Sequence, residues 1–510
     1  MMIPTTLRRT ETAAPTPRTK SSYLLNTLIG LALMAVISLL PAPAPLTPTG
    51  MAVVGVFVGT LYLWTTVDLV WPSVLGIALS AFFINSVMEP AALHGIWKSL
   101  QESVGNWVVA FVIGSLLLTY ALNESGLTSR IADWFLSRRW ARRSPWAFTY
   151  TLFACAFFLG MFLDLIPTLV FMIALLNAVF RKLGYTYGEK YPLVVIIGCT
   201  FLINIAFAIT PISHPVTLIG LGVFTGASGG ASIGFVEYML VGIPVGVVAA
   251  CLIILFLRYV VKPGMERFND VDFAELATEN ATPLSRREVA TAVIFSLVVI
   301  TWILPGLVSL IDPQAGIVTF FDEITLIVPT LFGVILLMLL RIDGKPLLDH
   351  TSALRTVPWG VISLVACAML FGTLLTEDAV GLNTFLVGAL SPLFASGMSP
   401  LLVMLVMVLA IAFITNVANH VPVIIMFVAV CVPLAEVLGV DNRLVGTLVI
   451  LAAQMGFALP SSLASVALIF GDPWVKPGAV VRYGVYATLV SALSIVVIGY
   501  PLATLVFAGG

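Results

Sequence analysis

The chain has few charged residues. Of its 510 residues 10% are Asp, Glu, Lys or Arg and 60% are hydrophobic, whereas soluble domains carry about 25% charged residues. The formal net charge of −1 shows none of the basic excess that nucleic-acid-binding proteins carry, so no nucleic-acid partner is expected. The composition excludes a soluble globular domain and indicates an integral protein with many spans in a lipid bilayer.

The residue patterns of enzymes are also missing. The five cysteines lie in apolar stretches without a C-x-x-C pair, which favours small core residues over disulfides or a metal site. No H-E-x-x-H, P-loop, nucleotide-binding or nucleophile–base pattern occurs. The one sizeable polar loop, 261–287, is too short for an ATPase domain. We therefore expect no enzyme and no cofactor, and transport that an ion gradient drives.

Two apolar stretches of unusual length organise the chain. Residues 146–180 contain the polar segment 164–168, and residues 400–435 contain the polar segment 415–422. A membrane helix needs about 20 apolar residues, so each stretch is too long for one span and short for two. The lengths predict two re-entrant hairpins with polar tips. Irregular backbone at membrane depth is tolerated where it lines a wet cavity, so each tip is expected to face a binding site.

Two further apolar stretches predict broken helices, because prolines and polar residues interrupt them. The first is 191–224, interrupted at 210–215, and the second is 444–470, interrupted at 459–462. Amphipathic surface helices are expected at 128–143, which mixes Arg with Trp and Phe, and at 380–397. The remaining apolar runs predict spans near 22–41, 49–65, 68–88, 105–124, 236–260, 288–311, 322–340, 358–378 and 480–507.

The two halves of the chain repeat at one offset of 255 residues. Gly126-Leu127 recurs as Gly381-Leu382, and Leu183-Gly184 recurs as Leu438-Gly439. The tip Asp164-x-x-Pro167 recurs as Asn419-x-x-Pro422. Five spans separate the hairpins, so the second enters from the opposite side, which defines an inverted repeat. The predicted fold is an all-α polytopic membrane protein with about 11 transmembrane helices, two oppositely oriented re-entrant hairpins and two broken helices.

Six segments follow from this prediction. They are a disordered cytoplasmic tail (1–21), N-terminal scaffold helices (22–104), the first inverted repeat (105–260), a cytoplasmic linker (261–287), further scaffold helices (288–357) and the second inverted repeat (358–507).

The basic residues predict the orientation. With the N-terminus in the cytoplasm and the C-terminus outside, 22 of the 24 Lys and Arg residues fall on the cytoplasmic side, and only Lys98 and Arg443 do not. This asymmetry agrees with the positive-inside rule. It also supports the hairpins. If either hairpin were a full crossing, the Lys and Arg residues that follow it would no longer fall mainly on the cytoplasmic side.

Candidate binding residues are the carboxyl, hydroxyl, amide and imidazole side chains at the tips and breaks. Inward-facing helix N-termini suit an anionic substrate, and unwound carbonyls with Ser, Thr and Asn oxygens suit Na⁺. For any single Ser or Thr, capping or a bond between helices is an equally good interpretation. The candidates are Asp164, Thr168, Thr210, Ser213, His214, Thr217, Thr415, Asn416, Asn419, His420, Ser461, Ser462 and Ser465.

Asp164 is the sharpest candidate among them. A carboxylate at mid-membrane costs about 2.5–3.5 kcal/mol on insertion scales, which favours a cation ligand or proton carrier. The competing interpretation is a cap on the second helix of the hairpin, since Asp-x-x-Pro fits an N-cap. The two histidines at the breaks, His214 and His420, suit either substrate contact or a neutral ring bound to a backbone carbonyl. If Na⁺ binds directly, Asp164, Asn416 and Asn419 are its expected ligands.

These motifs resemble those of the divalent anion:sodium symporter family, the sodium-coupled dicarboxylate, citrate and sulfate carriers of the wider ion-transporter superfamily. Pro358-Trp-Gly-Val361 is similar to the family's entry to the ninth span, and Leu159-Gly-Met-Phe162 to the lead into its first Ser-Asn-Thr motif. Phe457-Ala-Leu-Pro460 with Ile469-Phe-Gly471 frames the last break as in that family. The resemblance implies a secondary transporter of the bacterial inner membrane. It implies a small di- or tricarboxylate, or another divalent anion, as the substrate and Na⁺ as the coupling ion. It also implies an elevator-like mechanism and a homodimer.

The ligand positions depart from the family pattern. Asp164-Leu-Ile166 stands where the first Ser-Asn-Thr belongs, and Thr415-Asn-Val417 or a segment near Asn419 stands for the second. At the breaks, the family's Thr-Pro-Pro-Asn becomes His214-Pro-Val-Thr217 and Leu463-Ala-Ser-Val466. A cation/proton antiporter or arsenite-type carrier of the same superfamily is therefore the alternative, favoured by Asp164. No continuous polar stripe indicates a channel.

Overall fold

The structure is a computed structural model. It describes residues 20–507 apart from 89–92, 142, 213, 266, 269–282, 313, 376, 378–379, 383, 386–387, 389–398 and 436–438. The second expected surface helix, 380–397, lies largely outside the described residues.

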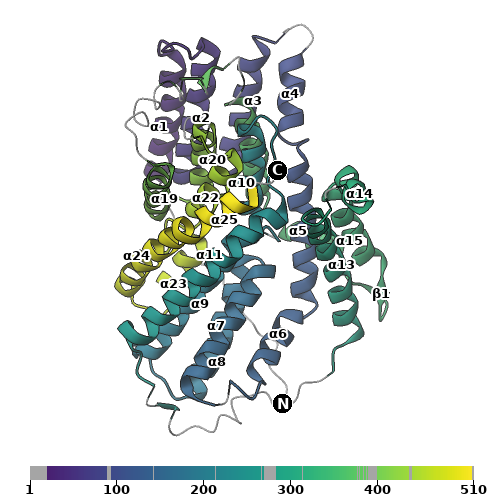
Figure 1. Cartoon of the computed structure of the whole chain (residues 1–510), viewed down its shortest axis with the longest axis vertical. Coiled ribbons are helices and arrows are strands. Elements are labelled where there is room, and N and C mark those ends of the chain that lie inside the picture. The colour runs from purple at the N-terminus through teal and green to yellow at the C-terminus, as the bar shows by residue number, and fades with distance from the viewer. Residues whose placement is uncertain are drawn as a thin grey trace.

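The N-terminal helices pack closely on one another. In α1 and α2, Gly30, Gly55 and Gly59 stand where an added Cβ would come within 2.4 Å of the neighbouring helix. Small residues allow such close approach between membrane helices. These four helices lie together at one end of the molecule (Figure 1): α1 Lys20–Leu39, α2 Pro48–Thr66, α3 Val70–Asn85 and α4 His94–Glu102. The sequence predicted no α4, because this short amphipathic helix has little hydrophobicity.

The first half continues with eight elements. α5 extends from the end that holds α1–α4 toward the opposite end, where α6, α7 and α8 lie (Figure 1). The elements are α5 Trp107–Glu124, α6 Leu127–Leu136, α7 Pro145–Phe162, α8 Leu165–Lys182, α9 Lys190–Ile209, α10 Pro215–Ala227, α11 Phe235–Leu255 and the π-helical turn η2 Phe256–Val261.

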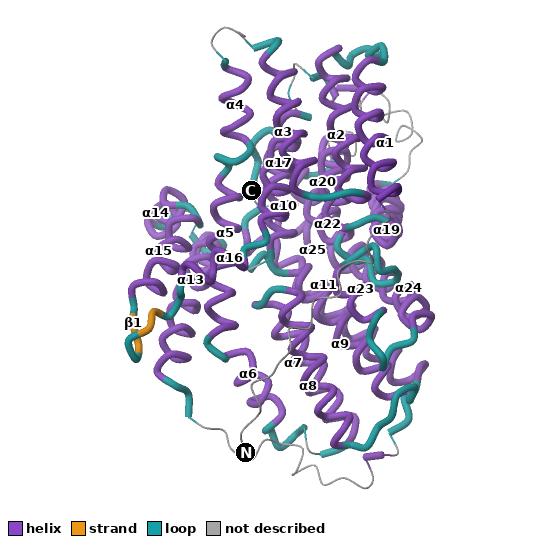
Figure 2. The backbone as a smooth tube through the Cα atoms, turned by 180° about the vertical axis from the view of Figure 1, so that it is seen from behind, coloured by secondary structure: helices purple, strands orange, loops and turns teal. Residues whose placement is uncertain are grey.

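The second half begins with a group of helices set apart to one side. Figure 2 shows α13–α15 beside α5, with the only sheet of the described residues, a two-stranded antiparallel hairpin, at their edge. The elements of this group are α13 Arg286–Ser309, α14 Gly316–Ile324, α15 Ile327–Leu339, β1 Arg341–Ile342 and β2 Lys345–Pro346. They are followed by α16 His350–Thr356 and by α17 Trp359–Leu374, which packs against α3 and α10 in the main body.

The C-terminal elements complete the fold. They are α19 Pro400–Val417, α20 His420–Cys431, the 3₁₀ turn η4 Val432–Leu434, α22 Asn442–Ala453, α23 Ala464–Phe470, α24 Pro477–Ser494, the π-helical turn η5 Ile495–Gly499 and α25 Tyr500–Phe507.

The helices have the length and composition of membrane spans. In the part of the chain that the structure describes, ten helices are long and apolar enough to cross a bilayer, or up to eleven if the bent pair α16/α17, at 65°, counts as one span. This confirms the predicted number and the class of integral membrane protein.

The helices also end where the sequence predicted interruptions. The two hairpin stretches each contain a break, at Leu163–Asp164 and at Ala418–Asn419. Both stretches begin alike: Ser144 and Ser399, which are 255 residues apart, accept a hydrogen bond from a first-turn amide, and a proline follows each. Whether the hairpins re-enter the same side of a membrane stays a prediction.

Helix α9 lies at the centre of the structure. All its residues from Tyr191 to Ile209 are buried, and α7, α8, α11, α23 and α24 pack around it. Helix α10 continues from α9 after the break and packs among α5, α17, α20 and α22. The two helices separated by the first break therefore have different neighbours. Helix α9 packs against the helices of the first hairpin, and α10 packs against a helix of the second.

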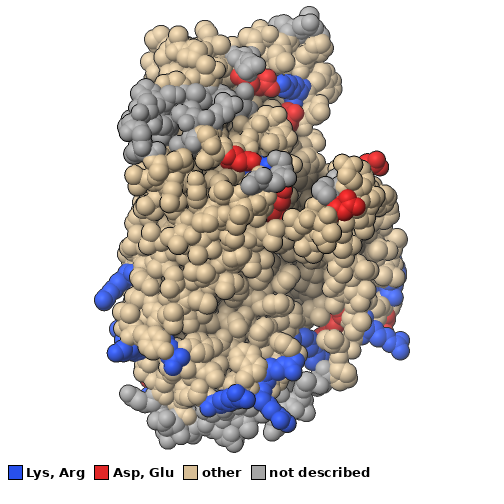
Figure 3. Space-filling model, viewed as in Figure 1, with Lys and Arg blue, Asp and Glu red and all other residues tan. Residues whose placement is uncertain are grey.

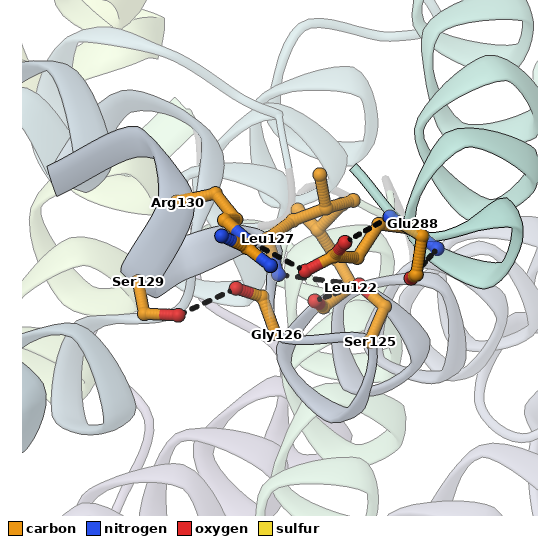
Figure 4. A network of polar contacts seen from close by, with 8 residues as sticks. Leu122, Ser125, Gly126, Leu127, Ser129, Arg130 and Glu288 are labelled. Carbon is orange, nitrogen blue, oxygen red and sulfur yellow. Dashed lines mark hydrogen bonds and ion pairs between the residues drawn. The ribbon is translucent and has the colours of Figure 1, made fainter. Parts of the chain in front are cut away.

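Helix α6 is fastened to α13 at its first turn (Figure 4). It begins at Gly126, whose φ of 88° is accessible to glycine at little cost. Arg130 Nε donates to Glu288 Oε1 at 2.9 Å, and Glu288 also accepts from the Ser285 amide in the capping box of α13. The helix ends at Leu136, short of the expected residue 143.

Candidate functional site

The tip of the second hairpin lies against the second helix break. The break, residues 454–463, is non-helical between α22 and α23. Thr415 Oγ1 donates to the Ala453 carbonyl at 2.7 Å, and the Ser462 carbonyl lies 2.9 Å from His420 Nδ1. Gly456 passes so close that an added Cβ would lie 2.8 Å from the Thr415 carbonyl. The tip and the break therefore form one hydrogen-bonded unit.

Asn416 is the centre of this unit. Its Oδ1 accepts from the Ala458 amide at 2.8 Å, while its Nδ2 donates to the Ala412 carbonyl at 2.7 Å and to Thr488 Oγ1 at 3.1 Å. Its backbone carbonyl accepts from Ser461 Oγ at 3.1 Å. Since both ends of the buried amide have partners, Asn416 fixes the position of the break relative to the tip.

The two hairpin tips differ in their capping residues. Asn419 caps α20, because its Oδ1 accepts from the Val421 amide at 3.0 Å. Asp164 occupies the matching position at the start of α8, but its side chain makes no capping hydrogen bond. It is half-buried, and its carbonyl accepts from Thr168 Oγ1 at 2.7 Å. The carboxylate of Asp164 therefore does not cap the helix as Asn419 does, and its one backbone contact is with the adjacent Leu165 amide.

The first tip also contacts a break. Thr210, the residue after α9, donates through Oγ1 to the Met161 carbonyl at the end of α7, at 3.0 Å. His214 precedes α10 and is fully buried, with its ring 4.3 Å from that of Phe207. Ser213 lies outside the described residues. Each hairpin tip therefore meets the helix break of its own half.

The breaks of the two halves meet through polar side chains. Thr217, in the first turn of α10, donates to Gln454 Oε1 at 3.3 Å, at the C-terminus of α22. Ser465, in the first turn of α23, donates to Asn204 Oδ1 of α9 at 2.7 Å. Ser462 Oγ donates to the Leu459 carbonyl at 2.6 Å within the second break. The candidates near the breaks are thus held in a network that joins the halves.

Sequence reasoning missed four residues of this network. They are buried polar side chains inside helices of largely apolar sequence, so a hydropathy value averaged over the helix does not reveal them. A single amide or hydroxyl in a helix that is otherwise apolar is the feature that could have found them. These residues are Asn204, Gln454 and Thr488, and also Tyr238, whose hydroxyl donates to the Ala208 carbonyl of α9 at 2.7 Å.

The electrostatics of the site come from backbone and neutral side chains. Helices α8, α10 and α20 begin at Asp164, His214 and Asn419, and helix N-termini carry partial positive charge that favours anions. Helices α9 and α22 end at the two breaks, where the last carbonyls carry partial negative charge and favour cations. No group of three His, Cys, Asp or Glu that could hold a metal ion occurs among the described residues.

One cavity lies away from the hairpin tips. It has a volume of about 850 Å³ and is lined by the loop 227–232 after α10, by Val432, Pro433 and Ala435, and by 440–443 at the start of α22. Its charged residues are Asp441 and Arg443, which form an ion pair at 2.8 Å. Because the tips are absent from this lining, we do not assign the cavity to the substrate site.

A family model described as "Citrate transporter" matches residues 27–453. The chain belongs to the citrate transporter family. It is therefore a secondary transporter and not an enzyme, and the resemblance to the divalent anion:sodium symporters is confirmed.

The relatives of this citrate transporter family member are distant but match along its length. The sodium-dependent dicarboxylate transporter SdcS of Staphylococcus saprophyticus is 22% identical over 499 residues, covering 94% of this chain and 92% of the relative. SdcS of Staphylococcus aureus strain MRSA252 is 21% identical over 512 residues, covering 96% and 93%. An uncharacterized transporter of Haemophilus influenzae is 22% identical over 430 residues, covering 82% and 86%.

Two solved structures share the fold. The YdaH transporter of Alcanivorax borkumensis superposes with a TM-score of 0.55 at 16% identity, covering 96% of this chain and 98% of that chain. MtrF of Neisseria gonorrhoeae, described as illuminating a class of antimetabolite efflux pumps, superposes with a TM-score of 0.56 at 12% identity, covering 94% of both chains. At these identities the likeness establishes the transporter fold alone.

Proposed function

We propose that this member of the citrate transporter family carries a small di- or tricarboxylate across the membrane together with Na⁺. The observation that carries the proposal is the unit formed by each hairpin tip and the helix break beside it. That unit offers helix N-termini and hydroxyls for an anion and unwound carbonyls for a cation. The names of the SdcS relatives, which are sodium-dependent dicarboxylate transporters, support the same substrate class and coupling ion.

The substrate site in this proposal lies between the two tips. The anion is held by backbone N–H groups and neutral side chains, and a bound cation offsets its charge, because Lys and Arg lie at helix ends and in loops. Asp164 and Thr168 contribute from the first tip, and Asn419 and His420 from the second. Asn416 positions the second break, since its amide is already hydrogen-bonded at both ends.

The remaining candidates are assigned to the two breaks. In this proposal the hydroxyls that donate to backbone carbonyls shape the backbone at the second tip and the breaks; they belong to Thr210, Thr415, Ser461 and Ser462. The remaining candidates are proposed to contact the ligand; they are Ser213, His214, Thr217 and Ser465.

The proposed mechanism is an elevator-like movement of the two hairpins and two breaks against the scaffold helices. Two features support it. The tips and breaks are bonded into one body through Thr217–Gln454 and Ser465–Asn204, and α6 is tied to scaffold helix α13 by Arg130 and Glu288. A homodimer is proposed on the family resemblance.

A cation/proton antiporter, or an arsenite-type carrier, is the second candidate. The uncapped, half-buried carboxylate of Asp164 favours it, since an intramembrane acid is a usual proton or cation carrier. The absence of a second acid in the described parts of the tips and breaks opposes it.

The test of the main proposal is thermal stabilisation of the purified protein. We expect a dicarboxylate such as succinate, or citrate, to raise the melting temperature only when Na⁺ is present. A ligand at one hundred times its dissociation constant stabilises the folded state by about 2.7 kcal/mol, so the effect is measurable without a transport assay. Choline replaces Na⁺ in the control. If no anion stabilises the protein and a Na⁺ or Li⁺ gradient alone moves protons in loaded vesicles, the antiporter proposal replaces this one.

The proposed orientation has its own prediction. Figure 3 shows Lys and Arg gathered toward the end of the molecule that holds α6–α8, and Asp and Glu toward the other end. In a chain without its native cysteines, single cysteines at positions 182 and 267 are expected to react with impermeant reagents only from the cytoplasmic side. Cysteines at 229 and 441 are expected to react only from outside. Labelling of 182 and 441 from the same side would contradict the inverted repeat.

A further inference from the structure

Helix α11 carries a single basic residue near its far end. The candidate span that α11 forms with the turn η2 runs from Phe235 to Val261, and apart from Glu237 in its first turn Arg258 is its only charged residue. These 27 residues extend about 40 Å, which is the thickness of a bilayer including its headgroup region. Arg258, three residues before the end of the span, therefore lies at the level of the lipid headgroups.

Three aromatic side chains lie around the guanidinium of Arg258. Its Cζ atom is 5.0 Å from the ring centroid of Tyr259, 5.2 Å from that of Trp146 and 5.6 Å from that of Tyr150. Arg258 Nη1 also donates a hydrogen bond to the Tyr150 hydroxyl. Trp146 and Tyr150 lie one turn apart in α7, whereas Tyr259 follows Arg258 in η2. These four residues form the Arg258 cluster, which holds the guanidinium in place from two helices.

The positive charge of Arg258 has no carboxylate partner in the part of the chain that the structure describes. The ion pairs found there belong to other residues. A guanidinium has five N–H donors, and the Tyr150 hydroxyl accepts from one of them. Charged groups at a membrane span are stable when they are paired or hydrated, and aromatic faces offset only part of that requirement. The cluster therefore offers a positioned positive charge to an anion from outside the protein.

The surface beside the cluster is apolar and open. Tyr259 is 56% exposed, and Leu255 and Leu252, which precede it on α11, are 46% and 39% exposed. The three residues are spaced i, i+3 and i+7, so they lie on one face of the helix. The leucines lie deeper in the span than Arg258, at the level of the acyl chains. This face thus combines hydrocarbon contacts with a cation at headgroup level, which matches the two parts of a phospholipid.

We propose that the Arg258 cluster binds the phosphate of an anionic phospholipid such as phosphatidylglycerol. Arginine presents paired N–H groups that match two phosphate oxygens, and Trp and Tyr rings favour the membrane interface. A phosphatidylglycerol headgroup neutralises Arg258, whereas the ammonium group of phosphatidylcholine would bring a second positive charge to the site. Inorganic phosphate has no acyl chains for Leu252 and Leu255 to contact, so it should not replace the lipid.

A lipid bound at this cluster would join two helices of the first half. Helices α7 and α11 both pack against α9, and the cluster connects the first two turns of α7 with the end of α11. Since a ligand that binds the folded state stabilises it by mass action, we expect the lipid to stabilise the folded protein. This effect depends on neither the substrate nor the coupling ion of the proposed function.

The test compares lipids added to the purified, delipidated protein in detergent. We expect phosphatidylglycerol to raise the melting temperature of the wild type, and phosphatidylcholine or inorganic phosphate at the same concentration to raise it little. In native mass spectrometry, Arg258→Gln should need about tenfold more phosphatidylglycerol than the wild type for the same occupancy by one lipid. Arg258→Lys keeps the charge without the paired N–H groups, so its affinity should lie between the two. Tyr150→Phe, which removes the hydroxyl that positions the guanidinium, should weaken binding by a smaller factor than Arg258→Gln.

Arg138→Gln is the matched control. Arg138 follows α6, is exposed, and lies with its Cζ atom 4.0 Å from the ring centroid of Trp134. Its replacement removes the same charge and one cation–π contact, and it should leave the lipid affinity at the wild-type value. Equal affinities of wild type and Arg258→Gln for phosphatidylglycerol overturn the site, and so does an equal loss of affinity in Arg138→Gln. Equal stabilisation of the wild type by phosphatidylglycerol and phosphatidylcholine also overturns it, even if Arg258→Gln does not fold.

Discussion

Asn416→Ala is expected to lose the hydrogen bonds that hold the second helix break to the second hairpin tip. The substitution removes the acceptor of the Ala458 amide and the donor to Thr488. Leaving one buried polar group without a partner costs about 1–3 kcal/mol, and here two groups lose theirs. We therefore expect a lower melting temperature and a loss of Na⁺-dependent stabilisation by succinate in the same variant.

Two further variants separate the site from general packing. Asn123→Ala removes one amide–hydroxyl bond, to Thr128 at 3.0 Å, at the end of α5 far along the chain from the tips. It should destabilise less and keep the response to Na⁺ and succinate. Asn416→Asp keeps an acceptor for the Ala458 amide but loses the amide donor. Its melting temperature should therefore lie between those of Asn416→Ala and Asn123→Ala. Equal melting temperatures for Asn416→Ala and Asn123→Ala would contradict the positioning role of Asn416.

The helices and their breaks could be predicted from the sequence because their causes are local. A run of about 20 apolar residues forms a span, and a proline such as Pro215 or Pro422 with polar neighbours before it starts a new helix. The repeated spacing of 255 residues then related the two hairpin tips, at Asp164 and Asn419, to each other. The short helix α4 was missed because neither cause applies to it.

The contacts between breaks could not be predicted, because they depend on how helices far apart in sequence pack. Asn204 and Ser465 are 261 residues apart, and Thr217 and Gln454 are 237 apart. The sequence pattern selected Thr217 and Ser465 for their position at a break, but it offered no reason to choose Asn204 or Gln454. Only the packing of α9 against α23, and of α10 against α22, brings them together.

The structure also separates two residues that the repeat equates. Asp164 and Asn419 are related by the offset of 255 and both precede the first turn of a helix. Capping alone would make them equivalent, since Asn and Asp rank alike at N-caps. Asn419 caps its helix and Asp164 does not, so an acidic side chain at the first tip needs another explanation.

Asp164→Asn is therefore expected to change cation dependence while the protein still inserts and folds. Removing the carboxylate removes the one formal negative charge at the first tip, and a change of about 1.4 kcal/mol in cation affinity is a factor of ten. We expect the Na⁺ concentration for half-maximal stabilisation by succinate to rise about tenfold or more. The melting temperature without ligand should stay close to that of the wild type, because no capping bond is lost.

Asp472→Asn is the control for the loss of a carboxylate. Asp472 is half-buried in the loop after α23 and accepts from the Trp474 amide at 2.9 Å, away from both tips. Burial raises the pKa of this carboxyl above its ordinary value. Its replacement should leave the Na⁺ titration unchanged. If Asp164→Asn keeps the Na⁺ titration but abolishes the effect of pH on transport, Asp164 carries a proton. If neither changes, the carboxylate has no part in coupling, and the cation sites must be sought among the neutral oxygens of the breaks.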